Sequence, residues 1–313
     1  GDRLHSEERI DYVPELARRI QETLDKGGNM IIPSFAVGRT QEMLYFIREI
    51  KNKGLVKGHD GFKVYVDSPL AVEATGIFLQ SHESNFDPET LAVIRQGINP
   101  IWSKGVTLSV TSEESKLINT DLQSKVILSA SGMCEAGRIR HHLKHNLWRS
   151  DSTILFVGYQ VPGTLGHSLL NGAKTVKLFG EEIEVKADIV KLPGISAHAD
   201  MDHLTEWIKA LKNKPEKVFI VHGEESSAEY FANHVIEETG FVAVAPYSGD
   251  TYDLISGQKI AEGSREHAQP KVKATTRKAN TVFDRLLIAG ERLISVIHKC
   301  QGMANKDLAK FAD

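Results

Sequence analysis

The sequence predicts an α/β protein with a doubly wound, mainly parallel sheet. Short apolar segments with the length of buried strands recur along the chain, and most are followed by a turn and a segment with helical spacing. Strand, turn and helix in repeated order is typical of a parallel sheet with helices on both faces. Several strand ends also open directly into turns rich in Gly and Ser, which suit the tight joints of such a fold.

The first half of the chain has the clearest elements. Leu16, Ile20 and Leu24 lie four apart and predict an amphipathic helix over residues 11–26, which Gly27 and Gly28 end. Residues 81–122 are polar and mixed, with helical stretches and no clear site. The other expected elements are strands at 29–33, 62–66, 125–130 and 152–157, and helices at 41–51, from 67 onward and at 137–147.

The second half continues the alternation and then changes character. Residues 163–166 open a further helix, and residues 176–185 alternate around a Gly turn, which predicts an antiparallel hairpin. Residues 263–279 are polar and basic and predict a linker. The remaining expected elements are strands at 189–192, 218–221 and 242–247 and helices at 202–214, 227–239 and 281–299.

Composition narrows the class of protein. The chain has 313 residues and a net charge of −3, so any contact with nucleic acid must come from a local patch. Its two cysteines, Cys134 and Cys300, are far apart, which favours a reducing compartment without disulfides, and we expect the cytoplasm. No apolar run is long enough to span a bilayer, and no signal peptide is recognisable.

Two histidines are the strongest candidates for chemistry. His198 and His222 each follow an apolar strand, and the segment between them has helical spacing. We expect both imidazoles at the carboxyl-terminal edge of one parallel sheet, where α/β proteins place their sites. Two neutral imidazoles can bind a metal or move a proton, although ordinary capping or surface histidines would give the same pattern.

Three strand-end turns are candidates for phosphate binding. Residues 34–39, 131–138 and 158–166 each lead from a strand into a helix, whose free N–H groups bind anions. Small residues are also needed there for structural reasons alone. The side chains and backbone that we expect to contact phosphate are those of Arg39, Ser131, Arg138, Gly163 and Thr164.

Three further features have weaker functional interpretations. His141 and His145 have the spacing of a zinc-binding pair, but their basic neighbours favour a solvated basic face. Asp67 ends a strand and is a candidate ligand, but the following Ser-Pro favours helix capping. Cys134 lacks a neighbouring His in any recognisable motif and is interpreted as a small buried residue.

The motifs together resemble the β-CASP branch of the metallo-β-lactamase fold, a group of RNA-processing nucleases. The resemblance runs from residue 1 to about residue 254. Residues 196–200 resemble its motif B and residues 221–224 its motif C. The matching internal landmarks are residues 1–3, 33–41, 66–71, 129–133 and 158–166.

The resemblance implies a function and roles for the histidines. The family hydrolyses RNA phosphodiester bonds with two Zn²⁺ ions per site, so RNA is the expected partner. His222 would be a zinc ligand, and His198 would contact the scissile phosphate and act as a general acid. A homodimer is left open, and no membrane partner is expected.

The resemblance also implies a division into domains. Residues 1–187 would form the β-CASP domain, residues 188–262 would return to the metallo-β-lactamase αββα fold, and residues 263–313 would be a basic linker and helix without assignment. The chain begins with Gly rather than Met, and the family's other zinc motifs would precede it. We therefore expect the C-terminal portion of a nuclease, inactive in isolation. The alternatives are a catalytically inactive RNA-binding or assembly module and an ordinary α/β protein that binds a small ligand.

Overall fold

The computed structural model describes residue 4 and residues 11–81, 83–192, 198–265, 289–290 and 293–294. The chain divides into two compact units, residues 1–212 and residues 213–313, which are described separately. Within the described residues, no helix is both long and apolar enough to cross a membrane.

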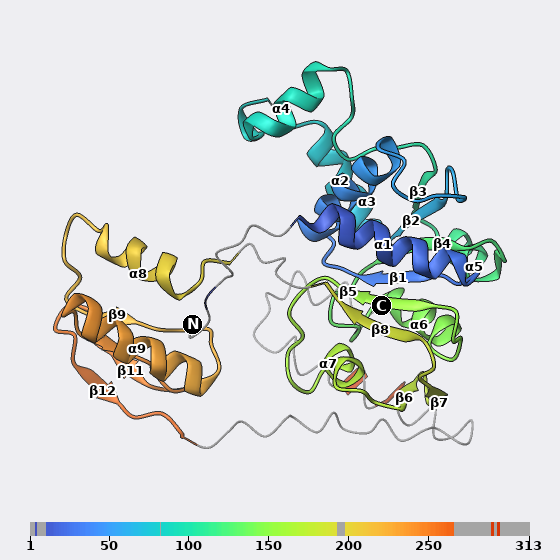
Figure 1. Ribbon diagram of the computed structural model, residues 1–313. Helices are drawn as coiled ribbons and strands as arrows, with labels where there is room; N and C mark the ends of the chain where they lie inside the picture. The colour runs from blue at the N-terminus through green and yellow to red at the C-terminus, as the bar shows by residue number, and fades with distance from the viewer. Residues whose placement is uncertain are drawn as a thin grey trace, which may run out of the picture. The chain divides into compact units, whose positions relative to one another are not determined.

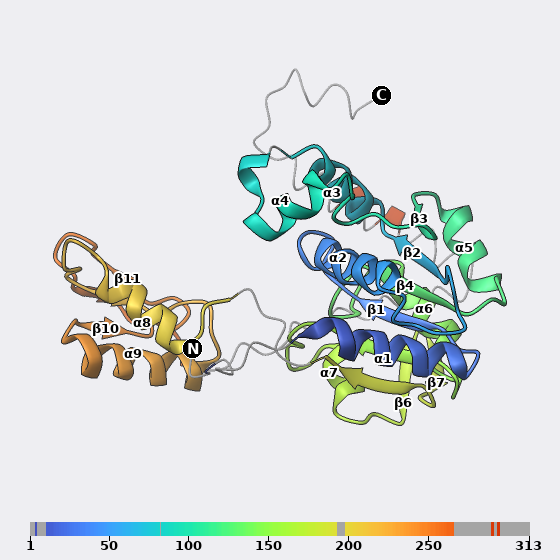
Figure 2. The same cartoon turned by 45° about the horizontal axis from the view of Figure 1, so that its top comes forward.

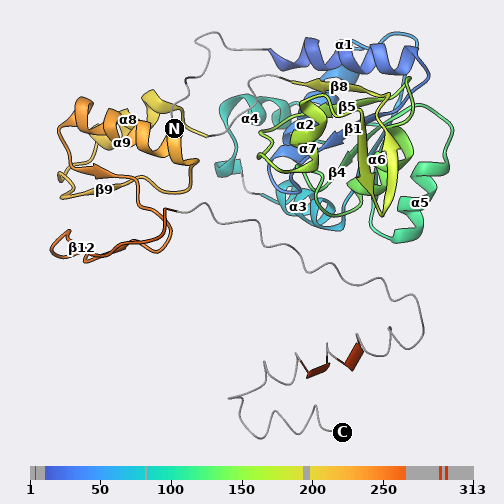
Figure 3. The same ribbon diagram turned by 90° about the horizontal axis from the view of Figure 1, so that it is seen from below.

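A six-stranded parallel sheet forms the centre of the first unit (Figure 1). Each neighbouring pair of strands runs in the same direction. Figure 3 shows β4, β1, β5 and β8 following one another across the sheet. In spatial order the strands are β3 (Val106–Ser109), β2 (Lys63–Asp67), β4 (Lys125–Ser129), β1 (Met30–Pro33), β5 (Thr153–Phe156) and β8 (Asp188–Lys191).

Helices cover both faces of this sheet, because its strands are apolar on both sides. Met30 and Ile32 pack into a core with the helices α1 and α2, whereas Ile31 between them packs into a second core with α6. Figure 2 shows α1 and α6 on opposite sides of the sheet. The helices of the first unit are α1 (Tyr12–Asp25), α2 (Arg39–Asn52), α3 (Pro69–Leu79), α4 (Pro88–Arg95), α5 (Ser112–Thr120), α6 (Ile139–Asn146), α7 (Leu165–Leu170) and α8 (Met201–Lys209), with a 3₁₀ turn, η1 (Glu83–Asn85).

These observations confirm the doubly wound, mainly parallel α/β fold that the sequence predicts. The expected hairpin is also present, as the antiparallel pair β6 (Thr175–Leu178) and β7 (Glu181–Glu184). The sequence pattern of residues 81–122 does not predict individual elements, and the structure has the strand β3 and the helices α4 and α5 there. Their polar and mixed composition reflects an edge strand and helices that are buried on one side only.

The second unit is smaller. It contains β9 (Val218–Phe219), α9 (Glu225–Thr239), β10 (Ala243–Val244), β11 (Thr251–Tyr252) and β12 (Lys259–Ala261). The strand β9 pairs with β10 in parallel, and β11 pairs with β12 in antiparallel orientation. The strand before His198, β8, therefore belongs to the six-stranded sheet, and the strand before His222, β9, belongs to another. The expectation that both strands share one sheet is wrong.

The sheet also continues past the expected domain boundary at residue 187. The strand β8 pairs with β5 along its whole length, and the division into two units falls after Lys212. The domain limits 1–187, 188–262 and 263–313 stay a prediction. The linker and helix expected after residue 263 lie outside the described residues, apart from residues 263–265, 289–290 and 293–294.

Candidate functional site at the carboxyl edge of the sheet

The three candidate turns lie side by side at one edge of the six-stranded sheet. Residues 34–39, 131–138 and 158–166 follow β1, β4 and β5, which are neighbours and parallel. The carboxyl ends of parallel strands meet at the same edge, where α/β folds bind their ligands. The topology therefore brings the turns with Arg39, Ser131, Arg138, Gly163 and Thr164 together.

Hydrogen bonds join two of these turns into one structure. The side-chain amide of Gln160 donates to the carbonyl of Gly132 over 3.0 Å, and the N–H of Gly166 donates to the carbonyl of Met133 over 3.2 Å. A Cβ on Gly166 would lie 1.8 Å from Oε1 of Gln160, so a larger residue would displace the Gln160 side chain that bonds to Gly132. The two turns are consequently held in a fixed relation.

The residues predicted to contact phosphate differ in the interactions that they already make within the protein. Arg39 forms an ion pair with Glu42 in the first turn of α2. Thr164 caps α7, where its Oγ1 accepts from the N–H of His167 over 3.2 Å. Gly163 has a φ of +85°, with open space around its Cα. The Oγ of Ser131 is buried and has no hydrogen-bond partner among the described residues.

Arg138 is held by contacts within the protein. Its Nη1 lies 2.8 Å from Oδ1 of Asp67, and its Nη2 donates to the carbonyl of Val110 over 2.6 Å. Only 19% of the Arg138 side chain is exposed. The guanidinium thus ties the end of the 131–138 turn to the ends of β2 and β3, and it places a positive charge at this edge.

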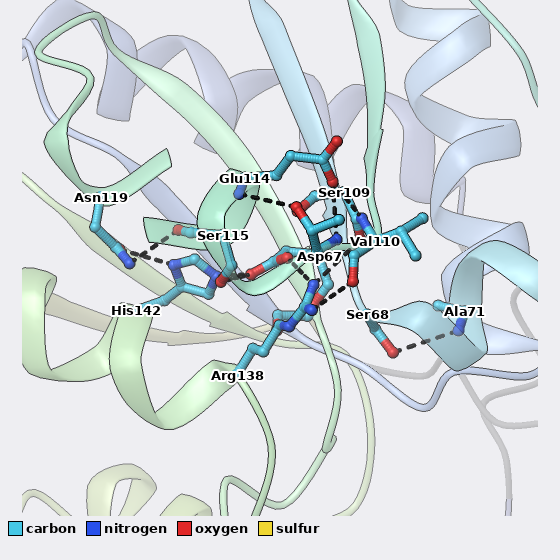
Figure 4. Close-up of polar contacts among 12 residues, drawn as sticks. Asp67, Ser68, Ala71, Ser109, Val110, Glu114, Ser115, Asn119, Arg138 and His142 are labelled. Carbon is cyan, nitrogen blue, oxygen red and sulfur yellow. Dashed lines mark hydrogen bonds and ion pairs between the residues drawn. The ribbon is translucent and has the colours of Figure 1, made fainter. Parts of the chain in front are cut away.

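Asp67 is the centre of a buried polar network (Figure 4). Besides Arg138, its carboxylate accepts from Ser115 Oγ over 2.6 Å and lies 2.6 Å from His142 Nε2. The side chains of Asp67 and His142 are fully buried. The interpretation of Asp67 as a helix cap is wrong, because Ser68 is the residue that caps α3. The solvated basic face expected around residues 141–145 is also only partly correct, since His142 faces the core.

The hydrogen bonds of His142 involve both of its ring nitrogens. Its Nε2 faces the Asp67 carboxylate, and its Nδ1 lies 2.8 Å from the side-chain oxygen of Asn119. The Asn119 amide nitrogen donates to the carbonyl of Ser115, which fixes the orientation of the amide. Both ring nitrogens therefore lie within hydrogen-bond distance of a side-chain oxygen. One buried carboxylate thus contacts the Arg138 guanidinium and the His142 ring.

This network predicts how stability depends on pH. Burial acts to raise the pKa of Asp67, but hydrogen bonds from His142 and Ser115 outweigh it and lower the pKa to about 2. The stabilisation by ionised Asp67 is therefore complete above its ordinary pKa of 3.8 and is lost as the pH falls through about 2. We expect the difference in unfolding free energy between the wild type and Asp67→Asn to shrink as the pH falls below about 4. Urea unfolding at several pH values measures it, and a difference that stays constant as the pH falls from about 4 to about 2 would contradict the assignment.

Cys134 behaves as the sequence predicts. Its side chain is fully buried, and burial raises the pKa of the thiol to about 12. A thiol is nucleophilic only as the thiolate. Cys134 therefore packs in the core, and a nucleophilic role is not supported.

His222 lines a cavity in the second unit. The residue follows β9 with a φ of +63°, and the cavity has a volume of about 270 Å³. Tyr247 also lines it, with its hydroxyl 2.8 Å from Glu225 and 2.6 Å from Glu229. The hydrogen bonds to Glu229 and Glu225 raise the pKa of Tyr247. The exposed side chain of His222 is thus beside acidic and phenolic groups of its own unit.

His198 lies in the first unit, two residues before the cap of α8. Its side chain is exposed. Asp200 caps α8, since its carboxylate accepts from the N–H of His203 over 3.0 Å. The capping interpretation of residues 196–200 is therefore correct for Asp200, and it leaves the role of His198 open.

A hydrolytic zinc site takes at least three protein ligands. Within the described parts of the chain, no three His, Cys, Asp or Glu side chains are grouped so that they could hold a metal ion. These residues alone therefore do not fit a complete zinc centre, and His222 can supply one ligand.

Fold and site define an α/β protein with a candidate anion-binding edge and a second unit that presents an exposed histidine. Comparison with known families gives the family. A model described as the Beta-Casp domain matches residues 40–169, and a model described as the Zn-dependent metallo-hydrolase RNA specificity domain matches residues 182–246. The chain belongs to the β-CASP family of the metallo-β-lactamase fold.

Several characterised proteins are similar over much of the chain. Ribonuclease TTHA0252 of Thermus thermophilus is 37% identical over 227 residues, which are 72% of this chain and 50% of that protein. Transcription termination factor FttA of Methanocaldococcus jannaschii is 35% identical over 73% of this chain and 36% of its own. An RNase J-like protein of the same organism is 31% identical over 75% of this chain and 52% of its own. The chain spans about half the length of the first of these relatives and about a third of the second.

Proposed function

We propose that this chain forms the RNA-binding part, and one side of the catalytic site, of a zinc-dependent nuclease that hydrolyses RNA phosphodiester bonds. The observation that carries the proposal is the meeting of three small-residue turns at one sheet edge in a β-CASP domain. The names of the relatives, a ribonuclease and transcription termination factors, support RNA as the substrate class.

The proposed substrate contacts follow from the chemistry of the edge. Unbonded backbone N–H groups of the turns and the hydroxyl of Ser131 are the proposed donors for phosphate oxygens, and Gly163 lets the strand approach closely. The Thr164 hydroxyl donates to the carbonyl of Val161 over 2.7 Å, so we propose that it contacts phosphate by exchanging that bond. Arg39 and Arg138 add positive charge. Because Arg138 already binds Asp67 and a carbonyl, we propose that it acts on phosphate mainly through its charge.

The proposed catalytic roles belong to the two histidines. We propose that His222 contributes one ligand to a zinc centre that other residues complete, and that zinc when bound supplies an activated water and charge stabilisation. His198 would donate a proton to the leaving oxygen, a role that suits a histidine near neutral pH. The family description of a Zn-dependent metallo-hydrolase supports a metal of this kind. A cytoplasmic location is part of the same proposal.

RNA binding and cleavage by the 313-residue chain test the proposal. We expect a labelled single-stranded RNA to bind with an affinity that falls steeply with salt, because phosphate contacts release counterions. We expect no cleavage, since the described residues supply no complete metal site. Fluorescence anisotropy and gel analysis with added Zn²⁺, with a chelator as the control, measure both. Failure to bind RNA at low salt would overturn the proposed function, and chelator-sensitive cleavage would overturn the incomplete site.

A further inference from the structure

An exposed aromatic ring projects from the turn between β6 and β7. Phe179 and Gly180 join these strands, with φ values of +52° and +86°. Two-residue turns of this kind favour Asn, Asp or Gly at the first position, because a bulky side chain is strained at positive φ. The Phe179 side chain is nonetheless 49% exposed, so the strain is not offset by full burial. Strain of this kind concentrates at functional sites.

The ring of Phe179 lies against the first turn of α6. The ring of His141 stacks on it, with centroids 4.4 Å apart and an interplanar angle of 26°. The guanidinium carbon of Arg140 lies 5.3 Å from the Phe179 centroid. We call these three side chains the aromatic shelf. Since α6 directly follows the 131–138 turn, the aromatic shelf adjoins the proposed phosphate-binding edge.

The charges around the aromatic shelf suit a nucleic-acid strand. Arg140 donates to the carbonyl of Glu135 over 3.1 Å and forms no ion pair within the described parts of the chain. Its Nε is buried and has no hydrogen-bond partner there. Of the three acidic residues of β7, Glu181 is paired with Lys144 at 2.6 Å and Glu184 with Lys186 at 2.7 Å, and the third is Glu182. Partial desolvation, and then the positive charges of His142, Lys144 and Arg140, lower the pKa of His141. The His141 ring is therefore uncharged at neutral pH and stacks as a flat aromatic group.

We propose that the aromatic shelf is a stacking subsite for a base of single-stranded RNA whose phosphate lies on the 131–138 turn. Every base has a π-face, and proteins bind single strands by pairing a charged track with aromatic or guanidinium planes on which bases stack. Phe179 provides the ring and Arg140 the cation beside it. This inference rests on the proposed function, because it assigns a place to part of the same substrate.

The competing explanation is that Phe179 only anchors the hairpin to α6. Phe179→Leu separates the two, because leucine keeps an apolar contact to the helix and removes the aromatic face. Phe179→Tyr keeps the aromatic face. Trp148→Leu is the matched control, since Trp148 is a 55% exposed aromatic residue just beyond the opposite end of α6.

Fluorescence anisotropy with two oligonucleotides tests the inference. One is a single-stranded RNA of mixed sequence, and the other has the same phosphates but abasic riboses. We expect Phe179→Leu to weaken binding of the RNA about tenfold and to leave binding of the abasic strand unchanged. The slope of affinity against salt should also be unchanged, since no phosphate contact is lost. Phe179→Tyr and Trp148→Leu should bind both strands like the wild type.

Two outcomes would overturn the inference while leaving the proposed function in place. One is equal RNA affinity of Phe179→Leu and the wild type. The other is an equal loss for the RNA and the abasic strand, which would indicate an anchoring role that shifts the phosphate-binding turn. A wild-type chain that binds neither strand would overturn the inference and the proposed function together.

Discussion

Replacing Asp67 with asparagine is expected to lower the free energy of unfolding of the first unit by about 3–5 kcal/mol, the usual cost of leaving a buried charge without its partner. Asparagine keeps the size of the side chain but replaces one carboxylate oxygen with an N–H₂ group. That group would face Arg138 in the place of Oδ1, or Ser115 and His142 in the place of Oδ2. Urea unfolding measures the loss. All three tryptophans of the chain precede residue 213, so their fluorescence reports on the first unit alone.

Ser115→Ala is the matched control for this substitution. It removes one hydrogen bond to Asp67 and leaves the contacts of the carboxylate with Arg138 and His142 in place. We expect it to cost about 1 kcal/mol, the net contribution of an ordinary hydrogen bond. If both variants unfolded at the same urea concentration, Asp67 would contribute only as an ordinary hydrogen-bond acceptor. The assignment of a buried charge pair would then be wrong.

The second large effect concerns the two histidines. In the protein that carries the complete zinc site, we expect His222→Ala to lower the affinity for zinc more than about 100-fold. Substitution of residues that only hydrogen-bond to the ligands lowers it roughly 10- to 100-fold. We expect His198→Ala to retain zinc and to slow RNA cleavage about 10²- to 10⁴-fold, as loss of a general acid does. Metal analysis and single-turnover cleavage rates measure the two effects separately.

His203→Ala controls for a general effect of removing a histidine near α8. His203 is an exposed residue bonded to the cap residue Asp200, and its Nδ1 lies 2.6 Å from the carboxylate. The variant should keep zinc and most of the cleavage rate. Equal loss of zinc in His198→Ala and His222→Ala would show that both histidines are ligands and that the proposed division of roles is wrong.

The sequence is sufficient for the fold because its signals are local. Apolar strand segments, the helical spacing of Leu16, Ile20 and Leu24, and the turns after β1, β4 and β5 are each local in the sequence, and adjacency in the sheet follows from parallel winding. The same locality places the candidate turns at one edge. The sequence does not predict the strand β3, because an edge strand is exposed on one side and lacks a continuous apolar run.

The Asp67 network could not be found in this way, because its members are far apart in sequence. His142 is 75 residues from Asp67, and Ser115 lies in the segment without a clear pattern. One signal was available. His142 lies on the helical stripe of Ile139, Leu143 and Asn146, all of which are buried. A histidine on an apolar stripe needs a buried partner, and Asp67 at a strand end was a candidate.

The position of β8 decides where the first unit can be separated from the rest of the chain. Its pairing with β5 covers a strand whose four residues are all buried. A protein shortened at residue 187 would leave β5 as an unprotected apolar edge, open to pairing with other chains and to aggregation. A truncated form intended for crystallisation or labelling must therefore retain residues through Leu192, whose side chain completes the core beneath α1.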